Sequence, residues 1–247
     1  MELYNYTVQK LSKVPKRKYK FICKPISDAM NGIYNSIMEA NNDYFHYGIK
    51  LLDKNERTKQ IINQIIGLQK QLLVLWNIEK YETKTMVRWI NLIDEEIYYI
   101  AKLGGLNPVK GKQYMYIIDY NSVHKAEFLS TMRDLHRFAY TKIIPTNSIF
   151  RDTRGILILE LVDEAWYRVT HANRYPVKTA KQYASRKEDI EIAMNCLKEL
   201  EQPMLALFNY MGYSETKMQQ WANLITKEQK LLKGLQISDK KRFENLK

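Results

Sequence analysis

The sequence predicts an all-α protein built as two tandem up-and-down four-helix bundles. Hydrophobic residues make up 45% of the 247 residues, while Gly and Pro number only 9 and 6. This composition is typical of helices joined by short turns. The chain also repeats itself, because adding 132 to the residue numbers places Trp89-x-Asn-Leu-Ile on Trp221-x-Asn-Leu-Ile. The match needs no gap from about residue 26 to 103, which indicates an internal duplication.

The first copy, residues 1–105, is predicted to contain four helices, at 3–13, 22–47, 54–79 and 82–103. The third helix has the clearest apolar stripe, since its hydrophobic residues recur at spacings of three and four. These residues are Ile62, Ile65, Ile66, Leu68, Leu72, Leu73 and Leu75. Asp53 and Glu56 have the spacing of a capping box at the start of that helix.

The second copy, residues 121–237, repeats the pattern, with helices predicted at 122–143, 152–175, 186–212 and 214–235. Pro203 lies inside the third of these helices and is expected to kink or divide it. Ser214 is a candidate N-cap for the fourth. Little helical pattern is found in residues 173–185, which are therefore predicted to form a loop.

Two further segments are predicted outside the bundles. Residues 106–120 overlap a cluster of Gly and Pro that runs from Gly104 to Gly111, and they are predicted to form a linker, in which 113–118 is either a short extended piece or more linker. Residues 238–247 contain Lys240, Lys241 and Arg242 and are predicted to be a flexible basic tail.

Membrane proteins and disulfide-rich secreted proteins are disfavoured. No apolar run approaches the roughly 20 residues that span a bilayer, and the N-terminus lacks the order of a secretory signal. A cytoplasmic location and no membrane partner are therefore expected. Cys23 and Cys196 have no CxxC spacing, so neither a disulfide framework nor a zinc site is expected.

Catalytic chemistry finds little support in the sequence. The nearest approach to a di-metal bundle motif is Asp43-Tyr-Phe-His46, which the second copy does not repeat. His124 and His171 stand alone, and His136 is predicted to belong to a basic surface. No phosphate-binding glycine loop or nucleophile elbow occurs. We expect no catalytic residue, no metal and no cofactor. An enzyme with a metal in the core of a bundle is kept as a hypothesis, after the two binding functions described below.

The net charge of +12 favours polyanionic partners. Residues 10–24 carry seven cations and no acid, with Tyr19 and Phe21 between them. This mixture suits phosphates and unpaired bases, but it also fits a solvated turn whose two aromatic rings face the core. A second basic cluster surrounds the turn between the second and third helices of the second copy. The candidate nucleic-acid-binding residues are Lys13, Lys16, Arg17, Lys18, Lys20, Lys24, Arg168, Arg174, Lys178, Lys181, Arg186 and Lys187.

The order of these features resembles a known family. A proline-basic turn at Val14-Pro-Lys leads into a helix that ends Glu-Ala-Asn41, followed by a Leu-rich helix, Tyr81 and Trp89. The second copy has Ala-Asn-Arg174 and Trp221 at the matching places. This pattern resembles the small four-helix-bundle family that includes Avd, the accessory variability determinant of diversity-generating retroelements.

The resemblance implies a non-catalytic partner of a reverse transcriptase. Avd-like proteins form ring-like assemblies of basic bundles that bind the polymerase and its structured RNA and support cDNA synthesis. Lys16, Arg17 and Lys18 match the family's proline-basic turn, and Arg174 matches the basic residue after its Ala-Asn helix end. The expected partners are thus a reverse transcriptase, structured RNA or an RNA–cDNA duplex, and further copies of the chain.

Two questions stay open at this point. Members of the family usually hold one bundle per chain, so the duplication leaves the oligomeric state and the ring stoichiometry undecided. The choice between a retroelement and an antiphage system derived from one is also open. The alternative function is a protein–protein interaction module that binds no nucleic acid.

Overall fold

The computed structural model describes residues 2–46, 51–79, 81–108, 126–174 and 176–245. Every regular element in these ranges is helical and none is a strand, which confirms the all-α prediction. The chain divides into two compact units, residues 1–117 and 118–247. Most of the predicted linker at 106–120, including the piece at 113–118, lies outside the described residues. The internal duplication remains a prediction from the sequence.

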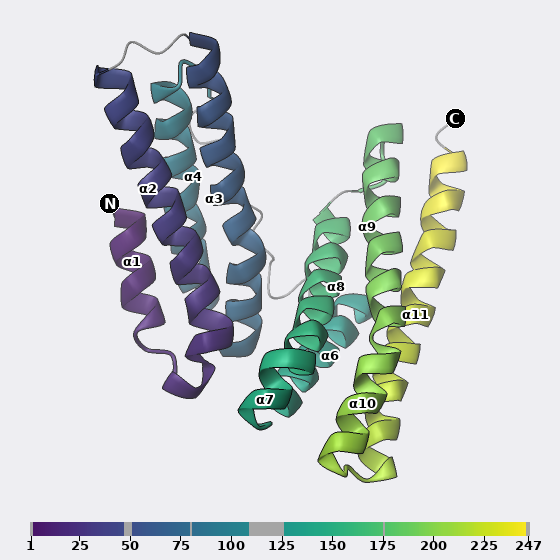
Figure 1. Cartoon of the computed structure of the whole chain (residues 1–247). Helices are drawn as coiled ribbons and strands as arrows, with labels where there is room; N and C mark the ends of the chain where they lie inside the picture. The colour runs from purple at the N-terminus through teal and green to yellow at the C-terminus, as the bar shows by residue number, and fades with distance from the viewer. Residues whose placement is uncertain (1, 47–50, 80, 109–125, 175, 246–247) are drawn as a thin grey trace. The chain divides into compact units, whose positions relative to one another are not determined.

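The first unit contains α1 (Glu2–Leu11), α2 (Lys24–His46), α3 (Leu51–Glu79) and α4 (Thr83–Leu103). Each helix packs on the next, and α1 also packs on α4, so that the four form a closed ring. Consecutive helices run in opposite directions (Figure 1). A short 3-10 turn, η1 (Lys16–Lys18), and a π turn, η2 (Tyr19–Cys23), connect α1 to α2.

The repeated tryptophan is a core residue in the first unit. Trp89 is fully buried, and its indole nitrogen donates a hydrogen bond of 2.9 Å to the Thr7 hydroxyl. Tyr81 donates to the Lys10 carbonyl at 3.0 Å, which ties the start of α4 to the end of α1. Cys23 and Cys196 are both free and buried.

The second unit contains α6 (Glu127–Ile143), α7 (Ser148–Phe150), η3 (Arg151–Gly155), α8 (Ile156–Arg174), α9 (Ala180–Glu199), α10 (Glu201–Met211) and α11 (Glu215–Glu244). Helices α6 and α9 both pack on α8 and on α11, which closes a ring like that of the first unit. The helix predicted around Pro203 is divided, because α9 ends at Glu199 and α10 begins at Glu201. Pro203 lies in the first turn of α10. Backbone N–H groups in a first turn make no hydrogen bond within the helix, so the absence of this group in proline costs no such bond.

Two predictions for this unit are wrong. The predicted loop at 173–185 is helical from Ala180, since the Thr179 hydroxyl caps α9 by accepting the Gln182 N–H at 3.2 Å. The predicted flexible tail at 238–247 continues α11 as far as Glu244. The rings of Tyr183 and Phe243 stack with centroids 4.4 Å apart and hold this last part of α11 against α9.

No helix of the described residues is long and apolar enough to cross a membrane.

Candidate nucleic-acid interface

The turn between α1 and α2 presents exposed cations together with an aromatic ring. Lys13, Lys16 and Lys20 are exposed, and Tyr19 keeps 50% of its surface in solvent. Phe21 is half-buried, with the Lys20 ammonium 5.9 Å from its ring centroid, while Ile22 behind it is in the core. The alternative interpretation of this segment, in which both aromatic rings face the core, therefore does not hold for Tyr19.

Other predicted residues of this turn have structural partners. The Lys18 ammonium lies 2.7 Å from the Glu79 carboxylate, and both side chains are largely buried. This pair fastens the turn to the end of α3. Lys24 forms an exposed pair with Asp28 one turn along α2. The side chain of Arg17 lies outside the described set.

Arg168 is part of the packing between α8 and α9. Its guanidinium contacts Glu164 at 2.7 Å and Asp189 at 3.0 Å, and Asp189 is only 2% exposed. His171 also binds Asp189, with 2.6 Å between the ring Nδ1 and the carboxylate. These contacts stabilise the α8–α9 interface, so Arg168 is a poor candidate for a phosphate ligand.

Arg186 was predicted at the surface, and the structure corrects this. Its side chain is buried, forms an ion pair with the buried Asp239 of α11, and donates to the Ala172 carbonyl at 2.8 Å. Because one guanidinium joins α8, α9 and α11, its charge is neutralised inside the unit. Arg174 is half-buried, and it too has contacts within the protein.

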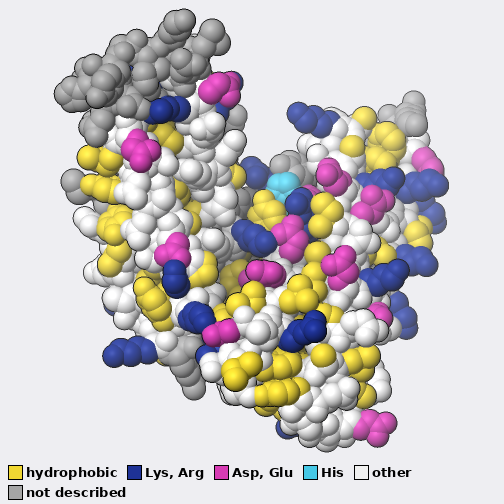
Figure 2. Space-filling model, in the orientation of Figure 1, with side chains coloured by type: hydrophobic (Ala, Val, Ile, Leu, Met, Phe, Trp, Pro, Cys, Tyr) yellow, Lys and Arg dark blue, Asp and Glu magenta, His cyan; other side chains and the backbone are white. Residues whose placement is uncertain are grey.

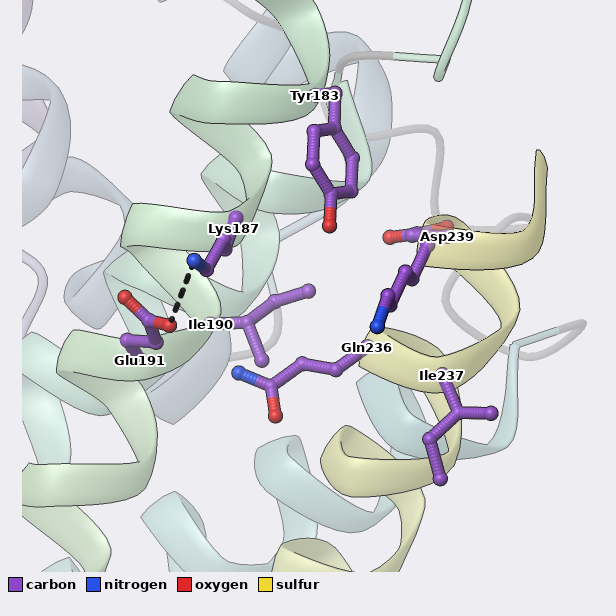
Figure 3. A pocket seen from close by; sticks show the side chains of 8 residues that line it. Tyr183, Lys187, Ile190, Glu191, Gln236, Ile237 and Asp239 are labelled. Carbon is purple, nitrogen blue, oxygen red and sulfur yellow. Dashed lines mark ion pairs between the residues drawn. The ribbon is translucent and has the colours of Figure 1, made fainter. Parts of the chain in front are cut away.

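The remaining predicted residues of the second unit lie at the surface. Lys178 and Lys181 are exposed near the start of α9, and Lys187 follows them with a loose pair to Glu191 at 3.7 Å. Lys187 lines a groove between α9 and α11 with Tyr183, Gln236 and residues of the last turns of α11 (Figure 3).

Sequence reasoning missed a row of lysines along α11. With about 100° of rotation per residue, five exposed lysines lie on the outer half of α11, away from its buried residues, and Lys240 is at the edge of this half beside the α9–α11 groove. The buried residues are Trp221, Ile225, Glu228, Leu232 and Asp239. We call the exposed row the lysine face: Lys227, Lys230, Lys233, Lys240 and Lys241. Figure 2 shows Lys and Arg side chains gathered over this side of the second unit. The assignment of 238–247 to a tail hid the continuity of the row.

The histidine predicted at a basic surface is instead in the core. His136 is fully buried, and its Nε2 lies 2.8 Å from the Asp163 carboxylate. Tyr140 donates to the same carboxylate at 3.0 Å, and burial with the nearby Asp163 charge raises the pKa of its hydroxyl well above the ordinary value. The three groups satisfy one another, as buried polar groups must.

Metal binding finds no support in the described residues, where no group of three or more His, Cys, Asp or Glu side chains could hold an ion. The side chains of Asp43 and His46, like His124, lie outside the described set. One buried acid remains: Glu228 of α11 is fully buried, and neither carboxyl oxygen has a hydrogen-bond partner among the described residues. Burial raises the pKa of this carboxyl to about 9, so it is neutral at pH 7.

No protein-family model matches this chain, and comparisons with curated proteins and with solved structures find no significant match. The resemblance to the Avd-like family accordingly rests on the sequence pattern alone.

Proposed function

We propose that this protein is a non-catalytic accessory protein that binds structured RNA and a reverse transcriptase. It would scaffold cDNA synthesis in a retroelement or in an antiphage system derived from one. The observation that carries the proposal is the α1–α2 turn, where Lys13, Lys16 and Lys20 surround the exposed Tyr19.

The turn has the chemistry that unpaired RNA requires. Ammonium groups neutralise phosphates, and a ring with a free face stacks on a base that has left its helix. The partly buried Lys18–Glu79 pair holds the turn against the end of α3, so these groups are presented from a segment that is tied to the bundle. Reverse transcriptase as the protein partner is supported by the Avd-like pattern of proline-basic turn, Tyr81 and Trp89.

A charge-reversal experiment tests the RNA part. Lys13, Lys16 and Lys20 are changed together to Glu, and binding of a structured RNA hairpin with a single-stranded loop is measured by fluorescence anisotropy from 50 to 200 mM salt. Each phosphate contact contributes about 0.7 to 0.9 to the slope of log affinity against log salt. We expect the wild-type slope to fall in magnitude by about 2 to 3 in the variant.

A matched control removes the same charge at the other end of the bundle. Arg57, Lys59 and Lys102 are exposed. Arg57 and Lys59 flank Thr58 of α3, and Thr58 lies against Gly104 at the end of α4, two residues after Lys102. The α1–α2 turn contacts Glu79, which is about 30 Å further along α3 at 1.5 Å per residue. The control, with these three cations changed to Glu, should keep most of the salt dependence. If the two variants lost equal amounts of RNA affinity and salt dependence, the turn would contribute only to the net charge of the protein and would not be a specific binding site.

The polymerase part needs a separate measurement. The wild type and the turn variant are purified from the native host, and the proteins and RNA that remain bound after washing are identified. The proposal requires a reverse transcriptase with both proteins, and markedly less RNA with the turn variant than with the wild type. If no reverse transcriptase were found among the proteins that co-purify with the wild type, the proposed binding to a reverse transcriptase would be refuted.

One observation favours the alternative of a protein-interaction module without nucleic-acid binding. Ile149 of α7 is 79% exposed, and Leu205 and Tyr210 of α10 keep 44% and 50% of their surfaces in solvent. Large apolar side chains in solvent are common at protein contacts. Wild-type protein that binds no RNA at 50 mM salt would establish this alternative over the proposal.

A further inference from the structure

The lysine face of α11 lies outside the packed core of the second unit, and among the described residues its contact to another helix is the exposed Lys227–Glu127 pair. Its five lysines are exposed, while Trp221, Leu232 and Asp239 on the opposite side of α11 make the contacts to the core. The equivalent positions of α4 show that the architecture does not require lysines there. Subtracting 132 from 227, 230 and 233 gives Glu95, Tyr98 and Ala101. The charge therefore distinguishes the second unit from the first.

Few acids neutralise this face. Lys227 pairs with Glu127 at 2.8 Å and Lys240 with Glu244 at 3.9 Å, and both pairs are exposed. Exposed ion pairs contribute little net stability, so a phosphate can replace the carboxylate at little cost. Within the described residues, Lys230, Lys233 and Lys241 have no ion-pair partner. The face thus carries a net positive charge that is available to a ligand.

The face offers point charges without stacking surfaces. Trp221 is buried on the other side of α11, and the ring of Phe243 is stacked on Tyr183. The exposed large apolar residue on this side is Ile237, which cannot stack on a base as an aromatic ring does. In contrast to the α1–α2 turn with its exposed Tyr19, this face can hold a phosphate backbone but cannot hold unpaired bases by stacking.

The dimensions fit a duplex. From Lys227 to Lys241 the helix rises about 21 Å at 1.5 Å per residue. B-form DNA carries one negative charge per roughly 1.7 Å of axis, and the A-form duplexes of paired RNA rise less per base pair, so such a length presents at least about 12 phosphates to five lysines. Lys187 widens the surface, because it lines the α9–α11 groove together with Lys240. In Figure 3, Gln236 reaches from α11 across this groove, while the Lys187 ammonium lies beside Glu191 on α9.

We propose that the second unit binds the sugar-phosphate backbone of double-stranded nucleic acid along the lysine face of α11, whereas the α1–α2 turn of the first unit binds unpaired RNA. This assignment rests on the proposed nucleic-acid-binding function and adds a division of labour between the duplicated units. The paired RNA of a stem and an RNA–cDNA hybrid share the required chemistry, and separate probes distinguish them.

The test compares two triple variants of the full chain with three probes. One variant changes Lys230, Lys233 and Lys241 to Glu, and the other is the turn variant described above. The probes are a 20-base-pair RNA duplex, an RNA–DNA hybrid of the same sequence and a 20-nucleotide uridine single strand. We expect the α11 variant to lose at least 10-fold in duplex or hybrid affinity, with a fall of about 2 to 3 in the salt slope.

The same variant should change single-strand binding by less than about threefold, because the turn is intact. A matched control changes Arg154, Lys198 and Lys217 to Glu, which are exposed cations outside the lysine face. A second variant with Gln at 230, 233 and 241 removes charge without adding repulsion, and far-UV circular dichroism verifies that each protein is folded. Duplex binding by the α11 variant that equals the control would overturn the assignment.

The outcomes separate this inference from the proposed function. No binding of any probe at 50 mM salt would refute both. If the turn variant keeps single-strand binding while the α11 variant loses duplex binding, the role of the turn fails and that of the lysine face stands. The inference is wrong if the α11 variant binds all probes like the wild type but differs from it in oligomeric state by sedimentation. The lysine face would then contact another copy of the chain, on which Glu95 and Tyr99 of α4 offer complementary chemistry.

Discussion

Replacing Glu228 by Gln should stabilise the second unit at neutral and alkaline pH. The pKa of this carboxyl is raised from 4.5 to about 9, mainly by burial, while the charge of Lys227 acts in the opposite direction. Between these two values the folded protein keeps a proton that the unfolded chain releases. The stability of the wild type is therefore complete below pH 4.5, falls as pH rises through this window, and reaches its minimum above about 9.

The magnitude follows from the width of the window. Each pH unit between the two pKa values costs about 1.4 kcal/mol, so the roughly 2.5 pH units from 4.5 to 7 cost about 3 kcal/mol. Glutamine has a similar shape and carries no proton to lose, but its buried amide leaves donors unpaired at a cost of about 1 kcal/mol. We expect Glu228→Gln to gain about 2 kcal/mol at pH 7 and about 4 kcal/mol at pH 8.5, and to lose about 1 kcal/mol at pH 4.5.

Urea denaturation followed by far-UV circular dichroism measures these differences. Wild type and Glu228→Gln are compared at pH 4.5, 7 and 8.5, with the exposed Glu95→Gln as a control that should change the free energy of unfolding by less than about 0.5 kcal/mol. The diagnostic result is a difference between variant and wild type that grows with pH. A constant difference, or a less stable variant at pH 8.5, would refute the assignment of a buried, protonated carboxyl.

Three further predictions concern buried contacts. Asp239→Ala should cost about 3 to 5 kcal/mol in urea denaturation, because it leaves the Arg186 charge buried without its partner; replacing both residues by Leu should restore most of the loss. Thr7→Val should cost about 1 to 2 kcal/mol in the same assay by removing the acceptor of the Trp89 indole N–H, whereas Thr7→Ser should not. The Cys23 thiol, whose pKa is raised to about 11 mainly by burial, should react with a chromogenic aromatic disulfide at pH 8 only after unfolding, as located by peptide mass.

The fold could be predicted because its information is local. Apolar spacing sets the helices of the first unit, and the predicted 54–79 and 82–103 differ from α3 and α4 by three residues or fewer at each end. Pro203 divides its helix through a chemical property of the residue itself. The errors arose where a tertiary contact decides the structure. Residues 238–244 contain few apolar side chains, and they are helical because Asp239 and Phe243 find partners on α9.

The candidate site was harder to predict for the same reason. Lys13, Lys16 and Lys20 are exposed, whereas Lys18 of the same acid-free segment pairs with Glu79, which lies 61 residues away. Arg186 looks no different in the sequence, yet its partner Asp239 lies 53 residues away. A count of Lys and Arg cannot tell a phosphate ligand from a buried ion pair, because the difference depends on acids brought together by folding.

The Arg186–Asp239 pair also affects what a ligand would encounter. If the last ten residues were a flexible tail, their backbone and side chains would have to be ordered on binding, at about 1–2 kcal/mol per residue for the backbone alone. Because the pair and the Tyr183–Phe243 stack already hold the end of α11 as a helix, folding has met this entropic cost in advance. Lys240 and Lys241 are thus preorganised at fixed spacing from Lys233, and a partner gains their full attraction without first having to fold them.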